Sequence, residues 1–153
     1  MVFIANSRLK YQMGDLKRSK KITVFAAPPL LNLVVIRSVD LDRSEAFYGA
    51  LGLFFDRHSH GSGPEHLATD PYKDGYVFEI YPANEQVGST KGTRIGFNVD
   101  AVDAYLDDLV AAGGKITQAP HDSEWGRRAV VTDPDGHKVE LVTPPNREKT
   151  IQG

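Results

Sequence analysis

The amino-acid sequence predicts an α+β fold built from two copies of a β-α-β-β-β module. Two strands of large apolar residues each carry one central glutamate, and these residues, Glu79 and Glu140, lie sixty-one positions apart. A Val-Asp pair stands between a strand and a helix at Asp40 and again at Asp100, sixty positions later. Two nearly equal offsets between matching patterns indicate a duplicated module.

Composition narrows the class of protein. At 153 residues, the chain fits one ordinary domain or two small halves that share a core. A net charge of -2 argues against a surface for nucleic acid or anionic membranes, which usually carries a basic excess. Without cysteine there is no disulfide, thiolate metal site or cysteine nucleophile. No apolar run approaches the ~20 residues of a membrane span, so we expect a cytoplasmic protein.

Residues 1–28 differ from the rest, with a basic arm followed by a short apolar run at 22–27. That run is shorter than the apolar core of a signal peptide. We interpret residues 1–28 as an N-terminal extension that adds an edge strand or packs on a partner subunit. The main domain is expected at residues 29–146, followed by a C-terminal tail at 147–153.

The first module is expected at about residues 30–83. Val, Ile and Leu dominate residues 30–39, which predicts a strand, and Asp40 or Asp42 can cap the helix that follows. Gly52 ends that helix. Its predicted apolar stripe consists of Ala46, Phe47, Ala50 and Leu51. Three further strands are predicted at residues 53–58, 65–69 and 76–81.

The second module repeats this order at about residues 93–144, after a polar connector at 84–92. A strand at 93–99 precedes a helix at 101–112, which has Val102, Tyr105, Leu106 and Leu109 on one stripe. The remaining strands are predicted at residues 115–118, 127–132 and 138–143.

The last strand begins with a tight turn, Asp-Pro-Asp-Gly at residues 133–136. By the two-residue period of a strand, Val139 and Leu141 share one face and Glu140 lies on the other. A carboxylate between apolar residues must lie in water, meet a cation or line a cavity, because burying it alone is costly. Glu140 therefore marks a candidate site.

Four motifs resemble the glyoxalase, bleomycin-resistance and extradiol dioxygenase superfamily, also called vicinal oxygen chelate proteins. They are DLDRSEAFY at residues 40–48, LG at 51–52, EWG at 124–126, and DPDG at 133–136 with Glu140. The resemblance implies two βαβββ modules that form a curved, partly open eight-stranded mixed β-barrel around a cavity. It also implies a homodimer.

Metal-dependent members carry ligands on the first and last strands of each module. The resemblance aligns those four positions with Leu33, Glu79, Arg94 and Glu140 of this sequence. Leu33 has no donor atom, and the guanidinium of Arg94 stays charged and repels a divalent ion. We therefore expect no metal cofactor. The alternative is a divalent metal, nickel, zinc, manganese or iron, held by Glu79 and Glu140.

Arg94 takes the place of the cation, and it can fork toward Glu79 and Glu140. The cluster is then either a structural ion pair or a site at which Arg94 holds an anionic or hydrogen-bonding group of a ligand. The ligand-binding cavity would also be lined by Leu33, Val35, Arg37, Val77, Tyr81, Asn98 and Trp125.

The histidines His58, His60 and His66 form a second candidate. They converge on one face if the strand at residues 53–58 continues to His60, and imidazole is a good ligand for zinc, iron or nickel. The Gly/Ser/Pro loop at residues 61–64 disfavours a rigid metal cage, so solvated loop histidines are the alternative.

Three functions follow from these residues. We favour a metal-independent small-molecule-binding protein of resistance or sequestration type, with no nucleic-acid or membrane partner. The alternative is a metal-dependent lyase or isomerase of glyoxalase type that uses Glu79 or Glu140 as general base, although a flanking Arg94 would stabilise the ionised carboxylate. An extradiol-type dioxygenase is third, since its iron site needs two histidines beside the carboxylate.

Overall fold

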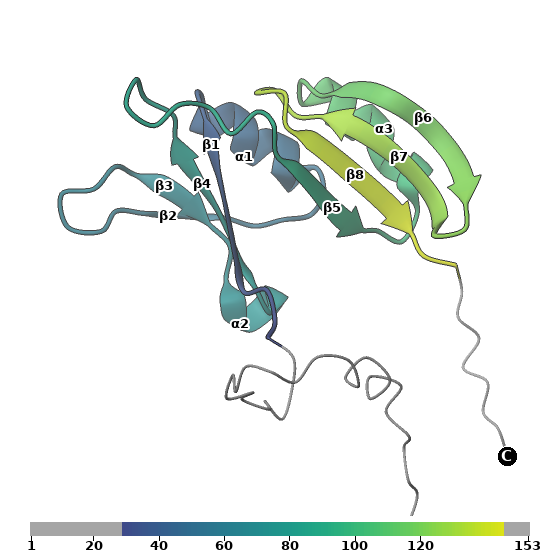
Figure 1. Cartoon of the computed structure of the whole chain (residues 1–153), viewed down its shortest axis with the longest axis horizontal. Coiled ribbons are helices and arrows are strands. Elements are labelled where there is room, and N and C mark those ends of the chain that lie inside the picture. The colour runs from purple at the N-terminus through teal and green to yellow at the C-terminus, as the bar shows by residue number, and fades with distance from the viewer. Residues whose placement is uncertain (1–28, 146–153) are drawn as a thin grey trace, which may run out of the picture. The chain divides into compact units, whose positions relative to one another are not determined.

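The structure, a computed structural model, describes residues 29–145 (Figure 1). The expected extension at 1–28 and the tail at 147–153 lie outside the described residues. The elements are β1 (Leu33–Ser38), α1 (Leu41–Gly49), β2 (Asp56–His58), β3 (His66–Ala68), α2 (Pro71–Asp74), β4 (Val77–Pro82), β5 (Arg94–Asn98), α3 (Val102–Ala111), β6 (Lys115–Ser123), β7 (Gly126–Thr132) and β8 (Lys138–Thr143).

Two four-stranded mixed sheets confirm the duplicated α+β module. Their strand orders, β1-β4-β3-β2 and β5-β8-β7-β6, are equivalent. In each sheet the first and last strands of the module pair in parallel, and the other pairs are antiparallel. Among the described residues the two sheets are separate and do not close into one hydrogen-bonded barrel. Each sheet therefore keeps its own open face, opposite the face that packs into the core.

Several elements differ from the sequence prediction. Strand β1 begins at Leu33 instead of residue 30, and β2 begins at Asp56 instead of residue 53. The short helix α2 was not predicted; the Asp70 side chain caps it by accepting from the Tyr72 N–H at 2.9 Å. Strand β6 runs to Ser123 instead of ending at Gln118, because it stays paired with β7 through two register shifts as far as Ser123 and Gly126. It is an edge strand of the second sheet. An edge strand tolerates the missing N–H of Pro120.

Helix α1 begins where Asp40 accepts a hydrogen bond from the Arg43 N–H at 3.1 Å. Its predicted apolar stripe was partly wrong, because Ala46 is exposed and Tyr48 is fully buried beside Phe47. Core packing was expected for both Phe47 and Tyr48 and is confirmed, and the Tyr48 hydroxyl has a buried partner in the second module. The stripe of α3 is confirmed, with Val102, Leu106 and Leu109 buried.

A hydrogen-bonded network joins the two modules at the turn before β8. The Tyr48 hydroxyl donates to Asp133 Oδ2 at 2.9 Å, and His137 Nδ1 lies 2.7 Å from the same oxygen. Thr90 Oγ1 lies 2.8 Å from His137 Nε2 and accepts from the Arg37 N–H at 2.8 Å. The chain can make this turn because Gly136 adopts φ +93°, as the sequence predicts.

Opposing effects act on the ionisable groups of this network. Burial acts to raise the pKa of Asp133, but hydrogen bonds from His137 and Tyr48 outweigh it and hold that pKa below its usual range. Burial, together with the neighbouring Asp133 carboxylate, raises the pKa of Tyr48. The network is therefore stable with Asp133 ionised and Tyr48 neutral.

No helix within residues 29–145 is long and apolar enough to cross a membrane.

Candidate functional site

The open face of the second sheet carries the polar residues that the sequence singled out. In β5, Ile95 and Phe97 pack against the core, so Arg94 and Asn98 point to the opposite side. In β8, Val139 and Leu141 are buried in the core and Glu140 lies on the open face. Since β5 and β8 pair in parallel, this alternation brings Arg94 next to Glu140.

Two arginines hold both oxygens of Glu140. Arg94 donates to Oε2 from Nη2 at 2.8 Å and from Nε at 3.0 Å. Arg128 in β7 contacts Oε1 through Nη2. The side chains of Glu140 and Arg128 are only 21% and 22% exposed, so the ion pairs are partly shielded from solvent. The carboxylate is thus already neutralised by protein cations.

A cavity of about 850 Å³ opens over this cluster. Trp125 stands at its rim with 65% of its surface exposed. Asn98 adds an amide group, and Glu124 lies at the exposed edge. The remaining lining residues are Gly96, Phe97, Val142, Pro144 and Pro145. Apolar walls with a few convergent polar groups are typical of small-molecule sites.

The other predicted site residues lie on the first sheet. Leu33, Val35 and Arg37 are on β1, and Val77, Glu79 and Tyr81 are on β4. Arg37 stacks on the Tyr81 ring, with its Cζ 5.1 Å from the ring centre. Within residues 29–145, Glu79 makes neither an ion pair nor a side-chain hydrogen bond, so Arg94 joins Glu140 but not Glu79.

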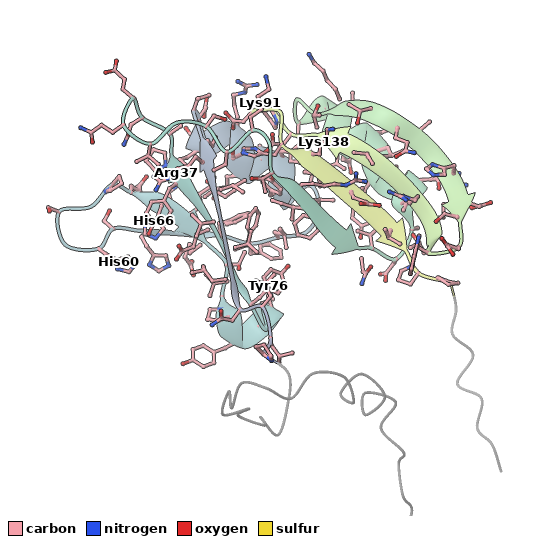
Figure 2. All side chains as sticks on the ribbon, viewed as in Figure 1. Arg37, His60, His66, Tyr76, Lys91 and Lys138 are labelled. Atoms are coloured by element: carbon pink, nitrogen blue, oxygen red, sulfur yellow. The ribbon has the colours of Figure 1, made fainter. Side chains whose placement is uncertain are left out.

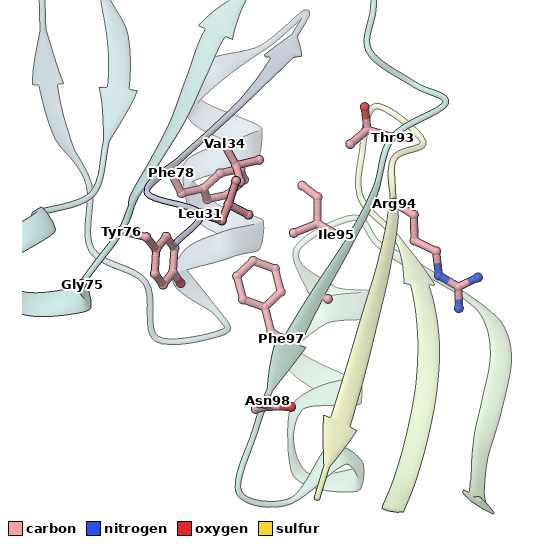
Figure 3. A pocket seen from close by; sticks show the side chains of 11 residues that line it. Leu31, Val34, Gly75, Tyr76, Phe78, Thr93, Arg94, Ile95, Phe97 and Asn98 are labelled. Atoms are coloured by element: carbon pink, nitrogen blue, oxygen red, sulfur yellow. The ribbon is translucent and has the colours of Figure 1, made fainter. Parts of the chain in front are cut away.

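A second, smaller cavity of about 570 Å³ lies between the first module and β5 (Figure 3). Leu31, Val34, Tyr76 and Phe78 line one side, and Ile95 and Phe97 line the other. Figure 3 shows the Arg94 side chain pointing away from these apolar groups. This cavity therefore lacks the charged pair, and we place the candidate site in the larger one.

Sequence reasoning missed Arg128. Its neighbours Ala129 and Val131 are buried, and the two-residue period then puts Arg128 on the same open face as Glu140. That periodicity was visible in the sequence. The pairing of β7 with β8, which brings Arg128 to Glu140, depends on the sheet order.

Comparison with known proteins identifies the family. Residues 30–141 match the family described as Glyoxalase/Bleomycin resistance protein/Dioxygenase superfamily. The chain belongs to this superfamily. A probable lactoylglutathione lyase of Vibrio cholerae is 31% identical over 130 residues, which covers 78% of this chain and 94% of the relative. A lactoylglutathione lyase of Haemophilus influenzae is 32% identical, with 71% and 87% covered.

Solved structures of the superfamily share the fold. The antibiotic-binding protein TnmS3 of Streptomyces sp. CB03234 superposes with a TM-score of 0.64 at 22% identity, covering 79% of this chain and all of that chain. A glyoxalase-related enzyme of Fulvimarina pelagi gives a TM-score of 0.61 at 26% identity, covering 76% and 88%.

The residues at the four positions implied by the resemblance do not fit the divalent metal found in many members of the superfamily. Leu33 offers no donor atom, and both oxygens of Glu140 are bound by arginine. A dication placed there would meet two guanidinium groups. Across residues 29–145, no three or more His, Asp or Glu side chains are arranged to hold a metal ion.

Proposed function

We propose that this superfamily member binds a small planar, anionic molecule in the cavity over Glu140, without metal, as a resistance- or sequestration-type protein. The observation that carries the proposal is the pair of arginines on Glu140. They occupy the carboxylate that would otherwise act as a metal ligand or general base. A site neutralised in this way is suited to binding and poorly suited to proton abstraction.

The arginines have hydrogen-bonding capacity beyond Glu140. A guanidinium carries five N–H donors, and Arg94 directs only its Nε and Nη2 groups to the carboxylate. About half of the Arg94 side chain is exposed to the cavity side of the sheet. The two arginines carry two positive charges against the one negative charge of Glu140. A carboxylate, phenolate or sulfonate of a ligand would complete this cluster.

Trp125 supplies the second element of recognition. Its exposed ring at the cavity rim offers a flat apolar face, which favours a planar ligand. TnmS3, an antibiotic-binding protein, has the same fold, which is compatible with a ligand of this kind.

Trp125 is also the only tryptophan of the chain, so its fluorescence reports on this cavity alone. We would titrate the full chain, in buffer with a metal chelator, with planar aromatic carboxylates such as 2-naphthoate. Saturable quenching is expected. Arg94→Met should weaken binding by about tenfold, because one charge-assisted hydrogen bond is lost.

Arg127→Met is the matched control. Arg127 adjoins Arg128 but lies on the other face of β7, where it pairs with Asp103 and Asp122. Its replacement should leave the dissociation constant unchanged. Quenching that requires added metal, or that Arg94→Met leaves intact, would contradict the proposal.

A glyoxalase-type lyase is the second candidate, because curated relatives at 31% and 32% identity are named lactoylglutathione lyases. This reading requires formation of lactoylglutathione after addition of nickel, zinc, manganese or iron. Activity should disappear in Glu140→Gln. If none of these metals gives turnover, the lyase function is excluded and the proposed binding function stands.

We further propose that the protein acts as a cytoplasmic homodimer. Leu33 and Val35 are exposed apolar residues of β1, and a second copy would cover apolar surface of this kind. Light scattering coupled to gel filtration measures the assembly directly, and a monomer at working concentration would exclude it.

A further inference from the structure

Three of the five histidines of the chain gather at the β2–β3 hairpin, on the first sheet. His58 and His66 are paired across the two strands, and His60 follows in the loop. The ring centres lie 6.0 Å apart for His58 and His66, 5.2 Å for His60 and His66, and 6.3 Å for His58 and His60. Figure 2 shows His60 and His66 in this hairpin, well away from Lys138 on β8.

His66 is the buried member, with 1% of its surface exposed. Its Nδ1 lies 3.4 Å from the Pro64 carbonyl oxygen. A carbonyl oxygen only accepts hydrogen bonds, so this long contact favours the tautomer with the proton on Nδ1 and the lone pair on Nε2. Nε2 is buried and has no hydrogen-bond partner within the described part of the chain. Buried polar atoms without a partner are rare in folded proteins and call for an explanation.

A metal ion would explain it. Metal-bound imidazoles commonly donate the N–H of one ring nitrogen to a backbone carbonyl while the other nitrogen binds the ion. The Tyr81 ring stacks on His66 at 4.1 Å, which fixes the plane of the imidazole. His66 is therefore held in one orientation with its lone pair available.

The other two histidines have room to adjust. Two imidazoles on one tetrahedral zinc ion place their ring centres roughly 5 Å apart, because each Zn–N bond is about 2.0 Å. The His60–His66 pair already has this spacing, and the two pairs that include His58 are somewhat wider. As the side chains stand, the three histidines do not form a group that could hold a metal ion. His58 and His60 are exposed, so their side chains are free to change rotamer, and metal binding requires rotamers that turn their nitrogens toward His66 Nε2.

The charged side chains around the hairpin are paired with one another, so the three imidazoles are the candidate metal ligands. Arg57 of β2 is held by Asp42, Glu45 and Glu65, so this cation is already paired, and the four groups together carry a net negative charge. Three neutral nitrogen ligands and an open position for water suit zinc, nickel or copper(II).

We propose that His58, His60 and His66 form a transition-metal site that takes one zinc ion and fixes the loop between β2 and β3. The site is independent of the arginine-lined cavity, which contributes none of these residues. Metal bound here would not alter the metal-free character proposed for that cavity.

The test is a calorimetric titration of the full chain, free of any affinity tag, with zinc chloride in a non-chelating buffer. We expect one zinc ion per chain. His60→Ala and His58→Ala should each weaken zinc binding by at least about tenfold. Both residues are exposed, so their replacement should leave the fold intact, which circular dichroism checks.

His121→Ala is the matched control. His121 Nδ1 also lies near a backbone carbonyl, that of Ala119, at 3.0 Å, but its ring has no other histidine ring beside it within residues 29–145. Zinc affinity should not change in this variant. Absence of stoichiometric binding, or equal losses in His121→Ala and His60→Ala, would overturn the proposal. Zinc lost in Glu140→Gln but kept in His60→Ala would also overturn it, and would place the metal in the other cavity.

Discussion

Replacing Tyr48 by phenylalanine removes one oxygen atom from the network that joins the modules. The Tyr48 ring is fully buried, with the Phe78 ring centre at 5.0 Å and the Phe47 ring centre at 5.1 Å. A phenylalanine ring fits the same space, so the aromatic packing remains. The hydroxyl donates only to Asp133, at 2.9 Å. The variant therefore isolates one buried hydrogen bond to a carboxylate.

The structure sets the magnitude of the effect. A hydrogen bond to a charged group contributes about 1.5 to 3 kcal/mol. Asp133 keeps the contact with His137 Nδ1 and accepts from the Asp135 and His137 backbone N–H groups at 3.0 and 2.9 Å. The carboxylate is not left without partners, so we expect a loss near the lower end, about 2 kcal/mol in the free energy of unfolding. This corresponds to a decrease in Tm of about 4 to 8 °C.

The pH dependence gives the prediction a second signature. The pKa of Tyr48 is raised in the folded protein, so its contribution to stability is complete below the unfolded tyrosine value of about 10 and is lost above it. The wild type should lose this contribution as the pH rises past 10, whereas Tyr48→Phe has none to lose. The stability difference between the two proteins should therefore shrink in alkaline buffer.

Urea unfolding followed by circular dichroism measures both effects. Tyr72→Phe is the control, because Tyr72 is 99% exposed and its replacement should change the stability by less than about 0.5 kcal/mol. Equal urea midpoints for Tyr48→Phe and the wild type at pH 7 would refute the reasoning. So would a stability difference that widens above pH 10.

Three further predictions concern stability. Gly126→Ala should lower the free energy of unfolding by at least about 2 kcal/mol, because φ is +111° and the added Cβ would lie 2.1 Å from a carbonyl oxygen of β8. Gly88→Ala is the control, since a Cβ there meets open space, and urea unfolding should show almost no change in its stability. Because the pKa of Asp133 is lowered in the folded protein, its ionised carboxylate adds stability above about pH 4, and this contribution is lost as the pH falls further. The free energy of unfolding of Asp133→Asn, measured at a series of acidic pH values, should therefore fall less steeply than that of the wild type. Leu109→Ala should cost about 2 to 5 kcal/mol in thermal unfolding, while Val110→Ala on the exposed side of α3 should cost less than about 1 kcal/mol; similar losses would contradict the assigned core.

Local patterns predicted most of the fold. The turn at residues 133–136 is confirmed because proline and glycine restrict the backbone within four residues, whatever the rest of the chain does. The inward position of Val139 and Leu141 is confirmed because a strand alternates its faces with a fixed period. The burial of Tyr48 was expected, but the partner of its hydroxyl was not predictable, because Asp133 lies eighty-five residues away.

For the candidate site, the sequence by itself determined which residue types were present. Leu33 and Arg94 at positions where the superfamily carries metal ligands already argued against a metal there, since an aliphatic side chain and a guanidinium cannot bind one. Which of these residues contact one another was decided only by the tertiary structure. Arg128 and Arg94 come from strands on either side of β8, so only the strand order β5-β8-β7 brings both to Glu140. Likewise, the sequence named His58, His60 and His66 as candidate ligands, but only the structure showed that His66 Nε2 is buried without a hydrogen-bond partner in the described residues, because burial and hydrogen-bond partners depend on contacts formed in the folded chain.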